Sequence, residues 1–183
     1  MAGNTFILSG VSGSGKSTIS DRLIAEHENL RRSITLTTRK PRAGERFGVH
    51  YFFVSPEIFK WLDETGQLLE HTQVYGDTFY GTLKLSVDTL LEHGHDVLFI
   101  VDNRGVNQIK EHFPSSKVAY LRAPNDDVQR ERLMSRGTVG EDLEMRVAKA
   151  HEELKMAEEH NWPIIVNDEL EQAMREVQAL FFT

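Results

Sequence analysis

The sequence predicts a three-layer α/β fold with a parallel central sheet. Short apolar runs alternate with segments of helical spacing along most of the 183 residues, a pattern typical of strands joined by helical crossovers. A glycine-rich loop follows the first apolar run and opens a helix. A later run, Val97–Val101, is continuously apolar and ends in Asp102, as expected of a strand buried on both faces. A chain of this length suits one domain with one hydrophobic core.

The elements can be placed in order from their periodicity and from the residues that start or stop them. Ser55 should cap a helix that has Pro56 at its first position. We expect strands over Thr5–Ser9, Ser33–Thr38, Tyr51–Val54, Leu68–Val74, Thr78–Gly81, Val97–Val101, Val118–Leu121 and Ile164–Val166. We expect helices over Lys16–His27, Pro56 to about Gly66, Lys84–His93, Gly105 to about His112, Pro124–Met134, Glu141–His160 and Glu169–Phe182.

Residues 39–82 depart from the regular alternation of strand and helix. Pro41, Gly44 and Gly48 lie among charged residues and indicate an irregular segment over residues 39–50. The Gly76-Asp77 pair should turn one strand back on the next. We therefore expect this stretch to be antiparallel and to form an insertion on the parallel core.

Composition argues against several classes of protein. Hydrophobic residues make up 39% and charged residues 27% of the chain, which is ordinary for a globular protein. The formal net charge of −7 argues against a nucleic-acid partner. The absence of cysteine excludes disulfides and thiolate metal sites. We find no signal-peptide pattern and no apolar run of transmembrane length, so we expect a cytoplasmic protein without a membrane partner. Nothing in the sequence indicates the oligomeric state.

The glycine-rich loop reads Gly10-Val-Ser-Gly-Ser-Gly-Lys-Ser17, which has the G-x-x-x-x-G-K-S spacing of a nucleoside-triphosphate loop. Its glycines allow backbone N–H groups to close on phosphate oxygens, and the positive end of the following helix favours the same anion. Lys16 can reach the outer phosphates, and the hydroxyl of Ser17 can ligate Mg²⁺. The candidates for ATP binding in this segment are Gly10, Ser12, Gly13, Ser14, Gly15, Lys16, Ser17 and Thr18.

A second cluster, Thr37–Glu45 followed by Gly48 and Tyr51, places Arg39 and Arg42 three residues apart near a tyrosine. A guanidinium fork suits a dianionic phosphate, and a tyrosine hydroxyl adds a directed hydrogen bond. The alternative is a solvated loop with charged side chains. Beside a triphosphate loop, the cluster favours a second site for a monophosphate.

These motifs resemble those of the guanylate kinase family, in order from Gly10 to Val166-Asn167-Asp168, and the Thr37–Tyr51 block is the most specific part of the resemblance. The resemblance implies a P-loop nucleoside monophosphate kinase fold with a parallel central sheet, an inserted mixed α/β subdomain that binds the monophosphate, and a helical lid. It divides the single domain into a core of about 1–36, 84–135 and 160–183, a GMP-binding insertion of about 37–83, and a lid of about 136–159.

The resemblance also implies the roles of individual residues. It implies an ATP:GMP phosphotransferase that uses Mg²⁺, with ATP and GMP, and also dGMP, as substrates. GMP would be bound by Thr35, Arg39, Arg42, Tyr51, Glu70, Tyr80, Thr82 and Asp102. ATP would be bound, besides the loop, by Arg132, Arg136 and Asn167. The catalytic residues would be Lys16, Arg39, Arg136 and Arg146, and Mg²⁺ would lie near Ser17 and Asp102.

Physical chemistry agrees with these roles but leaves alternatives open. Guanine presents two adjacent donors, which one carboxylate such as Glu70 can accept, whereas adenine lacks that pair. Glu70 could instead be a surface carboxylate, and Asp102 could be a helix N-cap. The lid arginines could pair on the surface with neighbouring carboxylates, which are Glu131, Asp142 and Glu144.

The chain departs from the family pattern near the acceptor pocket. Ile100 stands where the family usually has an acidic residue, and Asn103-Arg104 is also unusual. Two other functions therefore remain open: a P-loop kinase with another phosphorylated acceptor, and a non-catalytic binding module of the guanylate-kinase type. The intact Lys16 and Ser17 argue against the binding module.

Overall fold

The computed structural model describes residues 3–42, 44–74 and 77–183. The strands are β1 (Thr5–Gly10), β2 (Leu30–Arg32), β3 (Thr35–Thr37), β4 (Phe52–Phe53), β5 (Leu68–Val74), β6 (Thr78–Leu83), β7 (Asp96–Ile100), β8 (Lys117–Arg122) and β9 (Ile164–Val166). The helices are α1 (Lys16–Glu26), α2 (Pro56–Glu64), α3 (Lys84–Glu92), α4 (Asn103–His112), α5 (Asp126–Met134), α6 (Gly140–Glu159) and α7 (Leu170–Phe182).

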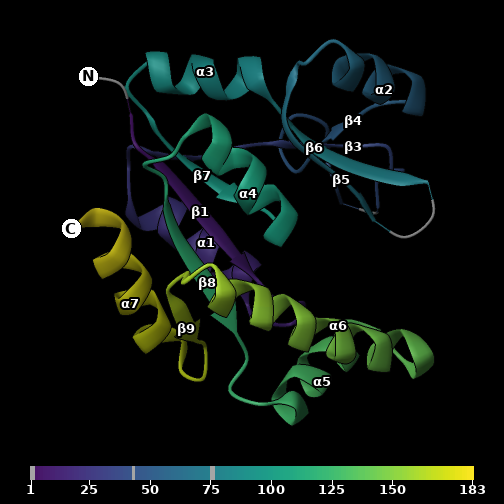
Figure 1. Ribbon diagram of the computed structural model, residues 1–183, viewed down its shortest axis with the longest axis vertical. Coiled ribbons are helices and arrows are strands. Elements are labelled where there is room, and N and C mark those ends of the chain that lie inside the picture. Colours follow the sequence, from purple (N-terminus) through teal and green to yellow (C-terminus); the bar gives the residue numbers. More distant parts are fainter. Residues whose placement is uncertain (1–2, 43, 75–76) are drawn as a thin grey trace.

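Five parallel strands in the order β2-β7-β1-β8-β9 form the central sheet (Figure 1). Side chains alternate along β1, so Phe6 and Leu8 pack on one face with α1 and α7, while Ile7 packs on the other with α3, α4 and α6. Burial on both faces explains why these strands read as continuous apolar runs. The three-layer α/β fold with a parallel sheet is confirmed.

A second sheet, in the order β4-β3-β6-β5, projects from the core together with α2. β6 pairs antiparallel with both β3 and β5, but β3 and β4 are parallel. The expectation of an antiparallel insertion is therefore wrong for one of the three strand pairs, β3 with β4. Parallel neighbours need a long connection that brings the chain back to the same end of the sheet, and a tight turn cannot provide it. Of the expected Gly76-Asp77 turn, Gly76 lies outside the described residues.

The strand expected over Ser33–Thr38 is confirmed as the shorter β3 (Thr35–Thr37), but the strand just before it, β2 (Leu30–Arg32), was not predicted. β2 pairs with β7 in the central sheet, and β3 pairs with β6 in the second sheet. Between them the backbone N–H of Ser33 still donates to the carbonyl of Leu98 at 3.0 Å. A β-branched sequence supports extended backbone throughout, so the pattern cannot show where a chain changes sheets.

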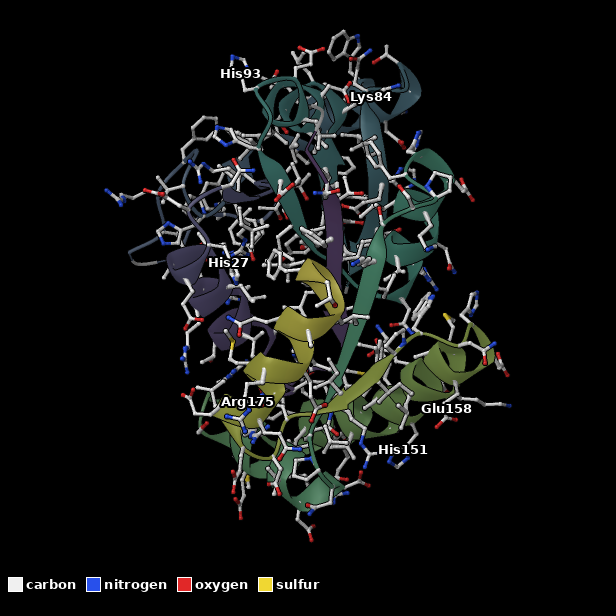
Figure 2. All side chains as sticks on the ribbon, turned by 90° about the vertical axis from the view of Figure 1, so that its left-hand side faces the viewer. His27, Lys84, His93, His151, Glu158 and Arg175 are labelled. Carbon is white, nitrogen blue, oxygen red and sulfur yellow. The ribbon has the colours of Figure 1, made fainter. Side chains whose placement is uncertain are left out.

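Helices α5 and α6 form a second projection on the same side of the core as the small sheet (Figure 1). They pack on each other through Leu133, Leu143 and Val147. Both chain termini lie on the opposite side of the core. Figure 2 views the molecule from the side of α7 and shows Lys84, at the start of α3, and His151, on α6, at opposite ends.

Two helix starts show how local chemistry fixes the elements. Ser55 accepts a hydrogen bond from the N–H of Ile58 at 3.3 Å and caps α2, with Pro56 at its first position, as predicted. Helix α4 starts at Asn103, two residues before the expected start, because the carboxylate of Asp102 caps it. Within the described residues, no helix is both long and apolar enough to cross a membrane.

Candidate active site

A cavity of about 360 Å³ lies at the carboxyl edge of the central sheet, between the two projections. Ligands of open parallel sheets bind at this edge, outside the ends of the strands. The cavity combines residues from the glycine-rich loop, both sheets and α6. Its lining consists of Gly10, Ser12, Lys16, Ser17, Arg32, Thr35, Tyr51, Glu70, Thr72, Tyr80, Ile100, Val101, Asp102, Arg146, Lys149 and Glu153.

The loop after β1 has the backbone that its glycines permit. Gly10 has a φ of 139°, and a Cβ there would lie 2.1 Å from the carbonyl oxygen of Leu121 on β8. Gly15 has a φ of 95° and caps α1. The side chain of Lys16 curls back over the loop and donates to the carbonyls of Gly10 and Val11. Burial lowers the pKa of Lys16 to about 8, and the nearby charge of Glu153 opposes that shift. Lys16 is therefore still mostly protonated at neutral pH.

Two expected ATP-binding residues lie beside the loop, outside this cavity. The side-chain N–H of Asn167 donates to the carbonyl of Ser14 at 2.8 Å, and Arg132 donates to the carbonyl of Asn167 at 3.0 Å. Arg132 thus contacts the loop region and not the neighbouring Glu131. The hydroxyl of Ser14 and one terminal nitrogen of Arg132 are buried without a hydrogen-bond partner among the described residues. Such orphaned polar atoms fit a site that a bound nucleotide completes.

Glu70 is the buried carboxylate of the acceptor side. Its side chain, on β5, is only 3% exposed, and one oxygen accepts a hydrogen bond from the hydroxyl of Thr82 on β6 at 2.7 Å. Burial raises the pKa of Glu70 to about 7; the Thr82 hydrogen bond opposes this shift and the charge of Asp102 adds to it. The alternative of a surface carboxylate is therefore wrong. Thr82 does not itself line the cavity; it reaches the site through Glu70.

Asp102 caps a helix, which was the alternative to a site role, and it also lines the cavity. One carboxylate oxygen accepts the N–H of Gly105 at 3.0 Å and caps α4, while the other accepts a hydrogen bond from the hydroxyl of Thr72 at 3.3 Å. The same side chain lines the cavity opposite Ser17 and Lys16.

The motif arginines Arg39 and Arg42 do not line the cavity. Arg39 forms a two-pronged ion pair with Glu45, with both N–O distances at 2.9 Å, and its Nε donates to the hydroxyl of Tyr80 at 3.3 Å. The ion pair lowers the pKa of Glu45 to about 2. Arg42 is exposed, and its backbone N–H donates to the same carboxylate at 2.7 Å. Tyr51 and Tyr80 both line the cavity, so two of these four predicted GMP-binding residues lie there.

Helix α6 contributes a row of charged side chains to the cavity. Arg146 lines the cavity and also pairs with Asp142 at 3.1 Å, so the surface pairing does not remove it from the cavity. Arg136 does not line the cavity, but its charge lowers the pKa of Lys16, behind burial as the main cause. Lys149 and Glu153, three and seven residues after Arg146, share its helix face and were not predicted. Their spacing from Arg146 was the available signal.

A Mg²⁺ ion fits the residues present. Ser17 and Asp102 line one cavity and could each offer an oxygen ligand, and within the described part of the chain no group of three or more His, Cys, Asp or Glu residues could hold a metal. Mg²⁺ that arrives with a nucleotide needs only one or two protein groups and keeps several waters.

Comparisons with known proteins agree with this geometry. The family model "Guanylate kinase" matches residues 2–183. A guanylate kinase of Clostridioides difficile is 38% identical over 179 residues, which cover 97% of this chain and 86% of that protein. A guanylate kinase of Bacteroides thetaiotaomicron is 42% identical over 178 residues, covering 96% of this chain and 87% of that protein.

Solved structures are similar as well. The crystal structure of a guanylate kinase from Anaplasma phagocytophilum aligns with a TM-score of 0.76 at 28% identity, and the alignment covers 98% of this chain and 85% of that one. A gluconokinase from Sinorhizobium meliloti aligns with a TM-score of 0.53 at 17% identity, which supports the fold alone. With a family model over nearly the whole chain and relatives near 40% identity, this chain belongs to the guanylate kinase family.

Proposed function

We propose that this enzyme transfers the γ-phosphoryl group of MgATP to GMP, and also to dGMP, to give ADP and GDP or dGDP. The observation that supports this best is that one cavity holds both the loop Lys16 and the buried Glu70. Lys16 belongs to the donor half of the site. Glu70 supplies a buried carboxylate that matches the two adjacent donors of guanine.

The chemistry proposed for these residues is positioning and charge neutralisation. The acceptor phosphate is already nucleophilic, so no general base is needed. Lys16 and Arg146 would neutralise charge that develops on the donor phosphates, and Tyr51 and Tyr80 would orient the acceptor phosphate. Mg²⁺, held by ATP with Ser17 and Asp102, would supply further neutralisation at the transferred group.

The division of labour between subdomains is also part of the proposal. The core of about 1–36, 84–135 and 160–183 would bind ATP, the insertion of about 37–83 would bind GMP, and the lid of about 136–159 would close over the phosphates. Arg39, Arg42 and Arg136 would reach the phosphates on closure.

The proposal is tested by measuring ATP consumption with GMP, dGMP, AMP, UMP and ribose phosphates as acceptors. We expect kcat/KM to be highest with GMP. Ile100 makes the cavity wall aliphatic at a position where the family usually has an acid, so another phosphorylated acceptor is the second candidate. A rate with GMP no better than with the other acceptors would favour it.

The Glu70→Gln variant tests the base contact inside the same assay. It replaces one acceptor oxygen with a donor that faces the guanine amine. We expect transition-state binding of GMP to weaken by roughly 2–4 kcal/mol while the KM for ATP changes little. An equal effect on both substrates would show that Glu70 has only a structural role.

A further inference from the structure

Arg32 is a cavity residue that lies outside every motif of the family resemblance. It is the last residue of β2, and its side chain lines the cavity together with Ser17, Thr35 and Tyr80. The motif arginines Arg39 and Arg42, in contrast, are absent from the cavity lining. The structure therefore brings an arginine to the cavity from a strand that the sequence motif does not include.

The alternation of β2 explains why Arg32 and not its neighbour faces the site. Leu30 is buried with α1 in the core, and Arg32, two residues later, lies on the same side of the strand. Arg31 lies on the other side, is exposed, and donates to the backbone carbonyls of Glu28 and Leu30 at 2.8 and 3.1 Å. Arg31, which does not line the cavity, can therefore serve as the control for substitutions at Arg32.

The charges around Arg32 leave it poorly neutralised. Among the cavity cations, Arg146 and Lys149 each pair with a carboxylate of their own helix at 3.1 and 3.5 Å, and Lys16 donates to two backbone carbonyls. For Arg32, the pairing found among the described residues is with the exposed carboxylate of Asp21, at 4.0 Å. An exposed pair at that distance contributes little. The same cavity is also lined by two aliphatic residues, Ile100 at the end of β7 and Val101 directly after it.

The position of Arg32 favours the acceptor phosphate over the donor phosphates. The side chain is 32% exposed and also lines an adjoining groove with Phe52 and Leu83 of the second sheet. It therefore lies at the junction of the core and the subdomain that carries Tyr51 and Tyr80. We propose that Arg32 binds the phosphate of the acceptor nucleotide, an inference that rests on the proposed function.

The test uses Arg32→Met, which keeps most of the apolar stem along the groove and removes the charge, with Arg32→Lys to restore the charge. Arg31→Met is the matched control. We would measure the Kd of GMP and of ATP by calorimetry, the steady-state kinetics with GMP, and the thermal midpoint of each variant. We expect Arg32→Met to raise the Kd of GMP about tenfold or more, because a charge-assisted contact is lost.

The remaining readouts separate phosphate binding from a structural role. Arg32→Lys should recover part of the GMP affinity, while the Kd of ATP and the thermal midpoint should stay within about twofold and a few degrees of the wild type. Arg31→Met should bind GMP like the wild type. GMP binding by Arg32→Met at wild-type strength, or equal losses for GMP and ATP, would overturn the inference. If the wild-type protein itself neither binds nor phosphorylates GMP, the proposed function falls too, so the two failures are distinguishable.

Discussion

At the scale of single residues, the hydrogen bonds of one carboxylate, that of Glu45, hold two of the predicted GMP-binding arginines. Glu45 accepts two hydrogen bonds from the guanidinium of Arg39 and a third from the backbone N–H of Arg42. This carboxylate thus fixes the side chain of Arg39 and the backbone at Arg42. Because its pKa is lowered to about 2, it stays ionised throughout the usual assay range.

We expect the Glu45→Gln variant to raise the KM for GMP about tenfold with little change in the KM for ATP, because Arg39 would lose its fixed orientation. Glu64→Gln, which breaks an exposed pair with Lys60 in the same subdomain, is the matched control. Steady-state kinetics with each substrate varied would measure both. A lower KM for GMP would instead mean that Glu45 competes with the phosphate for Arg39.

Glu70 should make GMP binding depend on pH. Burial raises its pKa to about 7, and only the ionised form can accept both guanine donors. We expect the Kd of GMP to rise as the pH falls from 8 to 6, with a limiting slope of about tenfold per pH unit below the pKa. Titration calorimetry at several pH values would measure it. In Glu70→Gln only the pH dependence of the GMP phosphate should remain, and an unchanged profile in that variant would contradict the assignment.

Rising pH should have the opposite effect on the folding stability of the ligand-free protein. The pKa of Glu70 in the folded protein lies above the ordinary value of 4.5, so the folded state holds the proton more tightly. The contribution of Glu70 to the stability of the ligand-free protein is therefore present below about pH 4.5 and is lost as the pH rises to about 7. Substrate binding and stability thus place opposing demands on this carboxylate.

At the scale of elements, α4 approaches β5 closely where it passes the carboxylate of Glu70. The first turn of α4 carries Gly105, where a Cβ would lie 2.8 Å from the Cβ of Val101 and 3.2 Å from a carboxylate oxygen of Glu70. No flexible side chain can yield on the Val101 side. The helix start, capped by Asp102, therefore requires glycine for steric reasons and not for its φ.

We expect the Gly105→Ala variant to unfold more easily, by roughly 1–3 kcal/mol, and to lose kcat/KM for GMP more than for ATP, since Glu70 must shift. Denaturant unfolding and steady-state kinetics would check both effects. Arg104→Ala, at the exposed neighbouring position, should change neither. If Gly105→Ala keeps wild-type stability and GMP kinetics, the first turn of α4 can shift to accept a Cβ without a loss of folding free energy, which would contradict the prediction.

At the scale of the whole molecule, the two projections on one side of the core leave the site open between them. Arg39, Arg42 and Arg136 do not line the cavity, and the proposed function has them reach the phosphates when the projections move inward. Closure would also exclude water, which would otherwise hydrolyse ATP.

We expect the radius of gyration, measured by small-angle X-ray scattering, to decrease when GMP and a non-hydrolysable ATP analogue are both present. Each ligand alone should give a smaller decrease, because each bridges fewer parts of the molecule. Lys16→Met, which weakens the loop's hold on ATP, should reduce the response to the pair. A radius unchanged by saturating concentrations of both ligands would contradict closure.

The sequence by itself determined the fold class, most elements and the donor loop, since these depend on local patterns. The apolar run before Gly10, the spacing to Lys16 and the cap at Ser55 are each set by neighbouring residues. The family resemblance added Glu70 and Asp102, and both line the cavity. Local patterns also explain why β3 was predicted and β2 was missed: β-branched residues favour extended backbone within Ser33–Thr38, whereas Leu30–Arg32 has none.

Only the tertiary structure decided which side chains share the cavity. Arg32, Thr72, Lys149 and Glu153 come from β2, β5 and α6, and no short motif joins them. The parallel pairing of β3 with β4, and the switch of the chain from one sheet to the other after Arg32, are equally nonlocal. The physical reason is that the burial of Glu70, which raises its pKa, and the 4.0 Å separation of Arg32 from Asp21 depend on the whole packed molecule and not on the order of its residues.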